Sequence, residues 1–141
     1  MLFAPGRTSV FARVAERHPQ LTMILDHMGV TAAMVKDNKV ADAIGETVAL
    51  AKYPNVSVKL SASPGISREP YPFRDVTAHI KRVFDAYGPQ RCYWGTDLTN
   101  SYAKASYRQR ISQFTEELSF LSDSDKDWVM GRAIVQRLKW T

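Results

Sequence analysis

Leu21-Thr22-Met23-Ile24-Leu25-Asp26-His27 is the stretch of sequence that decides the fold, and it follows directly on the phrase His18-Pro19-Gln20. Proline disfavours a helical conformation in the residue before it, so this phrase marks the end of a helix. The aliphatic residues that follow are nearly continuous, as they are in strands of a parallel sheet covered on both faces. The pattern predicts a strand over Leu21–Asp26 that begins just after a helix.

The same arrangement recurs twice, because Pro19, Pro54 and Pro89 lie 35 residues apart in similar phrases. The residues after the second and third prolines, Val56–Ala62 and Arg91–Gly95, are rich in β-branched, aromatic and aliphatic types, which favour strands. Repetition of a short unit at a fixed period is typical of folds built from repeated strand–helix units. We therefore predict two further strands over these ranges.

Helical patterns separate the predicted strands. In each of them, apolar residues recur at steps of three and four positions, which is the spacing of one helix face. These residues are Val10, Phe11, Val14 and Ala15 before the first strand, Val40, Ile44, Val48 and Ala51 before the second, Val76, Ile80, Val83, Phe84 and Tyr87 before the third, and Ile111, Phe114, Leu118 and Leu121 after it. Ser122 is expected to cap a final helix that bears Trp128 and Val129.

The predicted fold class is α/β, with three parallel strands alternating with helices in the order α-β-α-β-α-β-α-α. The segments between the strands are long enough for the crossovers that parallel pairing requires. A length of 141 residues fits one domain, and 45% hydrophobic with 23% charged residues is an ordinary globular composition. We therefore expect a single domain over residues 1–141.

Composition and charge argue against several classes of function. No apolar run approaches the ~20 residues of a membrane-spanning helix, and residues 1–19 lack the features of a secretory signal. The lone cysteine, Cys92, excludes an internal disulfide and is expected to pack in the core, so the cytoplasm is the expected location. The net charge of +5 is scattered and forms no basic stripe of the kind that binds nucleic acid. The basic residues late in the chain are assigned to a solvated surface: Lys104, Arg108, Arg110, Arg132, Arg137 and Lys139.

Two chemically active side chains occupy the place where parallel α/β folds bind ligands. Such ligands bind at the carboxyl ends of the strands, and the 35-residue register places His27, Ala62 and Asp97 there. A histidine and an aspartate at one mouth suit metal ligation or general acid–base chemistry. Each also has a plainer interpretation, with His27 as a hydrogen-bonded loop residue and Asp97 as the cap of the next helix. Their shared register favours the functional interpretation.

Further polar residues beside these positions are secondary candidates. Ser61 and Ser63 are candidates for hydrogen bonds to a small-molecule substrate, although serines are equally common in turns. Lys59 either points into a barrel toward an anionic substrate or lies outward at the rim, and the outward orientation is favoured. Asp26 either closes the first strand or orients His27.

The three strand phrases together resemble the last three strands of the amidohydrolase-related family. Residues 17–29, RHPQLTMILDHMG, resemble its sixth strand, residues 53–61, YPNVSVKLS, its seventh, and residues 87–97, YGPQRCYWGTD, its eighth. The closing segment resembles the family's terminal helices, with Gly131-Arg132 where many members have Gly-Asn. The resemblance covers nearly the whole chain and implies the C-terminal portion of a (β/α)8 TIM barrel.

The resemblance also implies roles for the two principal residues. His27 matches a histidine that in many members contacts a divalent metal or the substrate carbonyl, and Asp97 matches an aspartate that acts as general base and touches the metal where one is present. The implied cofactor is a divalent metal, with zinc expected first, although some lactonases of the family work without metal. The implied function is hydrolysis of a small carbonyl or lactone-type substrate, and the family also contains decarboxylases.

The chain departs from the family in what it lacks. The family's metal-binding His-x-His belongs to the first strand and another ligand to the fifth, and the sequence supplies neither. A complete barrel needs ~250 residues. Three hypotheses therefore stay open. One is a hydrolase that is inactive as an isolated fragment, and another is a non-catalytic fragment whose open strand edges pair with a second copy or with a chain that completes the barrel. The third is a small independent α/β domain that binds a ligand at the same mouth.

Overall fold

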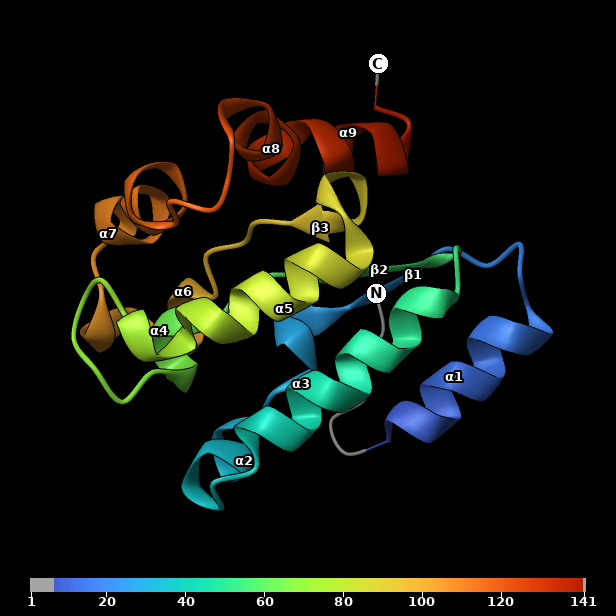
Figure 1. The fold of residues 1–141 in the computed structure, drawn as a ribbon, viewed down its shortest axis with the longest axis horizontal. Coiled ribbons are helices and arrows are strands. Elements are labelled where there is room, and N and C mark those ends of the chain that lie inside the picture. The colour runs from blue at the N-terminus through green and yellow to red at the C-terminus, as the bar shows by residue number, and fades with distance from the viewer. Residues whose placement is uncertain (1–6, 141) are drawn as a thin grey trace.

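The computed structural model describes residues 7–140, and these form three strands and nine α-helices (Figure 1). The strands are β1 (Met23–Leu25), β2 (Val56–Lys59) and β3 (Cys92–Tyr93). The helices are α1 (Thr8–Arg17), α2 (Ala32–Lys36), α3 (Val40–Ala49), α4 (Ser63–Ile66), α5 (Thr77–Tyr87), α6 (Leu98–Ser101), α7 (Tyr107–Ser112), α8 (Asp123–Asp127) and α9 (Ala133–Leu138). Residues 1–6 and 141, the ends of the predicted domain, lie outside the described residues.

The three strands form one parallel sheet in the order β1-β2-β3, as predicted. Leu25 pairs with Val58, and Val58 pairs with Cys92. These offsets are 33 and 34 residues, so the predicted register of 35 is wrong by one or two positions. The prolines mark where the helices end, whereas backbone hydrogen bonds and side-chain burial set the register between the strands.

Each strand is shorter than the sequence predicts. β1 has three residues, because Leu21 lies 49% exposed in the preceding loop and a 3-10 turn, Asp26–Gly29, begins directly after Leu25. Beyond β2, the Leu60 amide still donates to the Tyr93 carbonyl at 2.8 Å, but Ala62 adopts a left-handed conformation and ends the extended chain. The sheet thus ends close to the residues that carry the candidate chemistry.

The helix boundaries follow their sequence signals. α5 ends at Gly88, which has φ 73° and precedes Pro89. Ser122 caps α8 as predicted, since its hydroxyl accepts from the Asp125 amide and the Asp125 carboxylate accepts from the Ser122 amide. From α8 the chain continues through a wider, π-helical turn, Trp128–Arg132, into α9. Among residues 7–140, none of the helices is long and apolar enough to cross a membrane.

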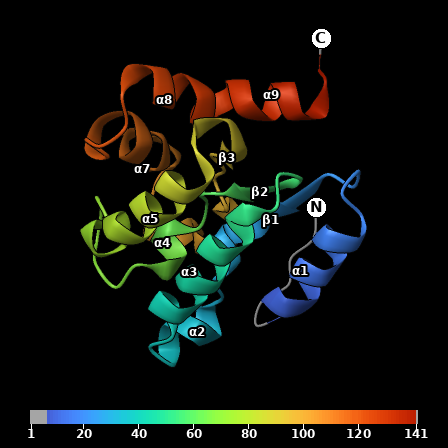
Figure 2. The same ribbon diagram turned by 45° about the vertical axis from the view of Figure 1, so that its right-hand side comes forward.

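The helices bury one face of the sheet. Figures 1 and 2 show α3 and α5 side by side across the strands, with α9 next to β3. The core includes Ile44 from α3, Val58 from β2 and Ile80 from α5, each 0% exposed. Full burial of one such side chain contributes about 1.5–3 kcal/mol. Cys92 is buried in the same core, which confirms its predicted structural role.

Candidate functional site

The carboxyl end of each strand is turned by residues in the left-handed region. His27 and Met28 follow β1 with φ 52°, Ala62 follows β2 with φ 74°, and Asp97 follows β3 with φ 46°. Such conformations cost on the order of 1–3 kcal/mol for a non-glycine residue and concentrate at functional sites. The two principal candidates are therefore themselves the residues that turn the chain out of the sheet.

Gly29 completes the turn after β1. It has φ 71°, and a Cβ atom there would lie 2.7 Å from the Thr47 hydroxyl oxygen. That hydroxyl comes from α3 and donates to the Met28 carbonyl at 2.8 Å. Glycine is required at this position because α3 approaches the turn too closely for any side chain.

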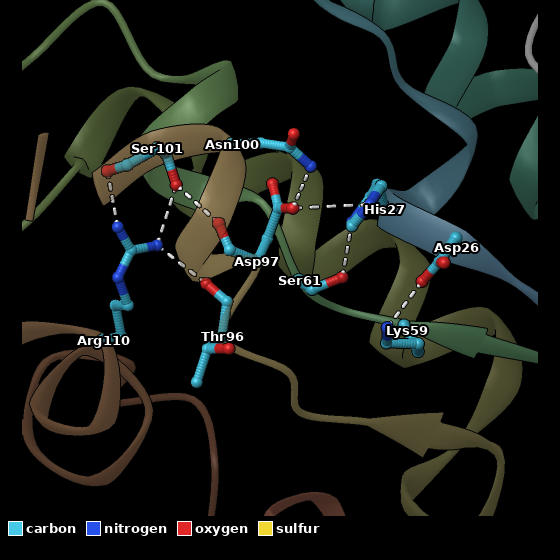
Figure 3. Close-up of polar contacts among 9 residues, drawn as sticks. All are labelled: Asp26, His27, Lys59, Ser61, Thr96, Asp97, Asn100, Ser101 and Arg110. Carbon is cyan, nitrogen blue, oxygen red and sulfur yellow. Dashed lines mark hydrogen bonds and ion pairs between the residues drawn. The ribbon is translucent and has the colours of Figure 1, made fainter. Parts of the chain in front are cut away.

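The structure brings His27, Ser61 and Asp97 together (Figure 3). His27 Nδ1 lies 2.8 Å from Ser61 Oγ, and His27 Nε2 lies 3.6 Å from Asp97 Oδ1. The imidazole thus lies between a hydroxyl from the end of β2 and a carboxylate from the end of β3. Ser61 makes this contact in place of Ala62, which the 35-residue register put at the same position as His27.

The contact between His27 and Ser61 permits two tautomers with different chemistry. A serine hydroxyl can donate or accept. If Nδ1–H donates to Ser61, the Nε2 lone pair is directed for metal coordination. If Ser61 donates to Nδ1, then Nε2 carries the proton and can donate to a carbonyl oxygen. The same pair of residues therefore suits both the metal-assisted and the metal-independent alternative.

Lys59 does not lie outward at the rim, so the favoured expectation for this residue is wrong. The Lys59 ammonium lies 2.7 Å from Asp26 Oδ1, and both side chains are largely buried (Figure 3). Lys59 shares its face of β2 with Ser61, since a Cβ atom on Gly95 would meet both side chains. Alternation along a strand places the two on the same face, opposite the core residues Val58 and Leu60. Asp26 is consequently paired with Lys59 rather than with His27.

Asp97 does not cap the next helix through its side chain. It occupies the N-cap position of α6, but among the described residues its carboxylate accepts no hydrogen bond from the helix backbone. Asp97 Oδ1 instead accepts from Asn100 Nδ2 at 2.7 Å. The carboxylate is thereby turned toward His27, and the helix-cap interpretation does not explain it.

Arg110 was assigned to the solvated surface, and the structure corrects this, since the residue is 2% exposed. Its guanidinium lies against the segment after β3 and donates to the carbonyls of Thr96, Ser101 and Ala105 and to the Ser101 hydroxyl. Burial lowers the pKa of Arg110, while the negative charge of Asp97 acts in the opposite direction. The sequence signal was available but weak: Arg110 lies four residues before Phe114, which belongs to the predicted apolar face and is buried.

A cleft of about 650 Å³ opens beside the strand ends. Its lining residues include Asp26, His27, Ala62, Asp97 and, from the segment after β3, Lys104. The three secondary candidates lie behind this wall rather than on it. Ser61 contacts His27, Lys59 pairs with Asp26, and Ser63 is 2% exposed with a hydroxyl that finds no partner within residues 7–140.

His27 and Asp97 fit part of a zinc site. Two ligands of a tetrahedral zinc lie roughly 3.4 Å apart, given bonds of about 2.0–2.2 Å, and Nε2 and Oδ1 are separated by 3.6 Å. Residues 7–140 contain no group of three His, Cys, Asp or Glu side chains that could hold a metal ion. A catalytic zinc has three protein ligands, so the described residues supply an incomplete set.

A parallel sheet with an imidazole and a carboxylate beyond its carboxyl ends is an arrangement found in (β/α)-barrel proteins, whose sites lie at that end of the strands. The chain belongs to the amidohydrolase family, since the model of that family, described as amidohydrolase, matches residues 4–134. No curated protein is similar enough to count as a match.

Two solved structures of an amidohydrolase from Burkholderia multivorans are similar to the chain. One was solved with bound Zn and the other with bound HEPES, and their TM-scores are 0.79 and 0.78. Each is 24% identical to the chain and matches 96% of it, but the match covers 50% of the solved chain. The chain thus spans about half the length of the structures that it matches. These matches confirm the predicted fold, the C-terminal portion of a TIM barrel.

Proposed function

We propose that the chain forms the Asp97 side of a hydrolase site that acts on a small carbonyl or lactone-type substrate. The observation that carries this proposal is the placement of His27 Nε2 and Asp97 Oδ1 3.6 Å apart at the wall of one cleft. Activity would require the remaining strands of the barrel, because the isolated chain presents only part of a site. The cytoplasmic location expected from the sequence stays a prediction.

The roles follow from the two side chains. Asp97 accepts a proton from a water molecule whose oxygen forms a bond to the substrate carbonyl carbon. His27, with its proton on Nε2, donates a hydrogen bond to the carbonyl oxygen as negative charge develops there. The carbon–oxygen bond of the lactone then breaks, and the leaving oxygen takes the proton back from Asp97.

Metal dependence is the alternative arrangement of the same site. His27 and Asp97 would hold a zinc ion together with ligands from outside residues 7–140, and Ser61 would fix the His27 tautomer by accepting from Nδ1. A bound zinc polarises a carbonyl and makes its water a nucleophile near neutral pH. The zinc in one of the similar structures supports this arrangement.

The test is an assay of lactone hydrolysis, in which the release of acid is monitored. It uses the chain in whatever assembly it forms, with and without added Zn²⁺. Asp97→Asn should lower kcat by about 10²–10⁴-fold, the usual contribution of a general base. Asp85→Asn is the matched control, because Asp85 lies on α5 in an exposed pair with Lys81. Undiminished turnover of the Asp97→Asn variant would overturn the proposal.

A second candidate is a non-catalytic association module. Its motivation is the outer edge of β1, which has no strand partner among residues 7–140, although a closed barrel pairs every edge. The edge would pair with a second copy of the chain or with a chain that completes the barrel. Sedimentation velocity of the chain alone tests this idea, and a stable monomer at all concentrations would rule out pairing with a second copy and count against the module.

A further inference from the structure

The buried guanidinium of Arg110 directs all of its observed hydrogen bonds to one segment, residues 96–105, which follows β3 and carries Asp97. Nη1 donates to the Thr96 carbonyl at 2.7 Å and to the Ser101 hydroxyl at 2.8 Å. Nη2 donates to the carbonyls of Ser101 at 2.6 Å and Ala105 at 3.2 Å. A single planar cation therefore ties together both ends of the loop (Figure 3).

These contacts restrain the peptide groups on both sides of Asp97. The Thr96 carbonyl, which belongs to the peptide group before Asp97, accepts directly from Arg110. The Asp97 carbonyl, which belongs to the next peptide group, accepts from the Ser101 hydroxyl at 2.9 Å, and that hydroxyl accepts in turn from Arg110. Fixing both peptide groups fixes the left-handed φ and ψ of Asp97, 46° and 40°, and hence the direction of its Cα–Cβ bond, while Asn100 restrains the carboxylate itself.

The backbone of Arg110 is also hydrogen-bonded to the segment that follows the sheet. Trp94, which directly follows β3, donates from its indole nitrogen to the Arg110 carbonyl at 3.2 Å. Arg110, which lies on α7, is thus hydrogen-bonded both to the end of β3 and to residues 96–105. Arginine suits this task because its donors form a rigid fork that can reach several carbonyls at once, whereas a lysine ammonium is a point charge on a flexible stem.

We propose that Arg110 is a positioning residue, which acts through Thr96 and Ser101 to hold the Asp97 carboxylate toward His27. Its catalytic consequence rests on the proposed function of Asp97, whereas its effect on the Asp97 backbone does not. Arg110 sits behind the Asp97 loop and acts on the reaction only through that residue.

The test compares Arg110→Met and Arg110→Lys with Arg108→Met in the full chain. Arg108 is the matched control, since it lies on the same helix and is exposed. Backbone ¹³C and ¹⁵N chemical shifts of residues 96–101 report the Asp97 conformation directly. In an active assembly, kcat and KM are measured for each variant, alone and combined with Asp97→Asn.

Arg110→Met should change the shifts of residues 96–101 and lower kcat roughly 100-fold with little change in KM, as expected when a reacting group is misplaced. Arg110→Lys should restore part of both, and Arg108→Met should change neither. In the Asp97→Asn background the kcat cost of Arg110→Met should vanish, whereas a general structural role would leave it intact.

Wild-type shifts at residues 96–101 in Arg110→Met would overturn the proposal, and so would an equal kcat loss in the Asp97→Asn background. If Arg110→Met does not fold, Arg110→Lys carries the same comparison. Failure of the proposed function can be told apart from failure of this proposal. It would show as undiminished turnover of Asp97→Asn, whereas the chemical shifts test the role of Arg110 without any activity.

Discussion

The ends of β1 and β3 present their functional side chains in different ways. After β1, two consecutive left-handed residues and Gly29 make a tight turn, which the Thr47 hydroxyl holds through one hydrogen bond. After β3, Asp97 alone is left-handed, and a buried cation on α7 holds the loop that follows it.

The two ends differ in the kind of contact that holds each of them in place. The β1 end depends on the absence of a side chain, because α3 packs directly onto Gly29. The β3 end depends on the presence of a long side chain, because three backbone carbonyls of residues 96–105 accept hydrogen bonds from the Arg110 guanidinium. Close packing therefore fixes one catalytic candidate, and a hydrogen-bond network fixes the other.

The largest expected effect is at the β1 end. Gly29→Ala should lower the free energy of unfolding by roughly 2–4 kcal/mol, since it combines a left-handed alanine with a displaced Thr47 hydroxyl. Urea denaturation measures the change. The matched control is Gly45→Ala inside α3, where a Cβ atom would meet nothing within 4 Å and where stability should rise by about 0.5–1 kcal/mol. Equal stability of the two variants would show that close packing does not hold the β1 end.

The next effect probes the β3 end. Ser101→Ala should lower the free energy of unfolding by about 1–3 kcal/mol, because it leaves the Asp97 carbonyl and one Arg110 donor without this partner. Ser119→Ala is the control, since Ser119 is exposed. Thermal or urea unfolding gives the comparison. A Ser101→Ala variant as stable as the control would mean that the network does not hold this loop.

The sequence predicted the arrangement of the sheet and the meeting of His27 and Asp97 at one edge of it, because the signals are local. Proline phrases and apolar periodicity mark helices and strands, and the ends of parallel strands must meet at one edge. It missed the register by one or two residues, since loop geometry between a proline and a strand leaves no reliable pattern. It put Ala62 at the position of His27, whereas Ser61 makes the contact.

The buried polar residues could not be derived in the same way. Arg110 was assigned to the surface because arginine is seldom buried, and only the acceptors of residues 96–105, which the fold brings into direct contact with its guanidinium, explain its position. Lys59 was placed outward because a charge in a strand is costly without a partner, and Asp26 supplies that partner. Both errors arise because tertiary contacts decide whether a charge can be buried.

The smallest effect concerns Ser61, which lies just after β2 and contacts His27 at the β1 end. Ser61→Ala removes the partner of His27 Nδ1 and should leave the fold intact. Loss of such a partner behind a metal-binding or catalytic histidine costs about 10–100-fold in metal affinity or activity, and we expect the lower end, about tenfold. The measurements are kcat in the active assembly and Zn²⁺ affinity by calorimetry, with the exposed Ser9→Ala as control.

The two measurements separate the two tautomers of His27. If Ser61 accepts from Nδ1–H, the hydroxyl directs the Nε2 lone pair to a metal, so Zn²⁺ affinity and kcat should fall together. If Ser61 donates to Nδ1, the proton on Nε2 is needed for the carbonyl, so kcat should fall while any Zn²⁺ affinity holds or rises. If neither kcat nor Zn²⁺ affinity changes, His27 does not need the Ser61 hydroxyl. The turn at Gly29 would then position His27 alone.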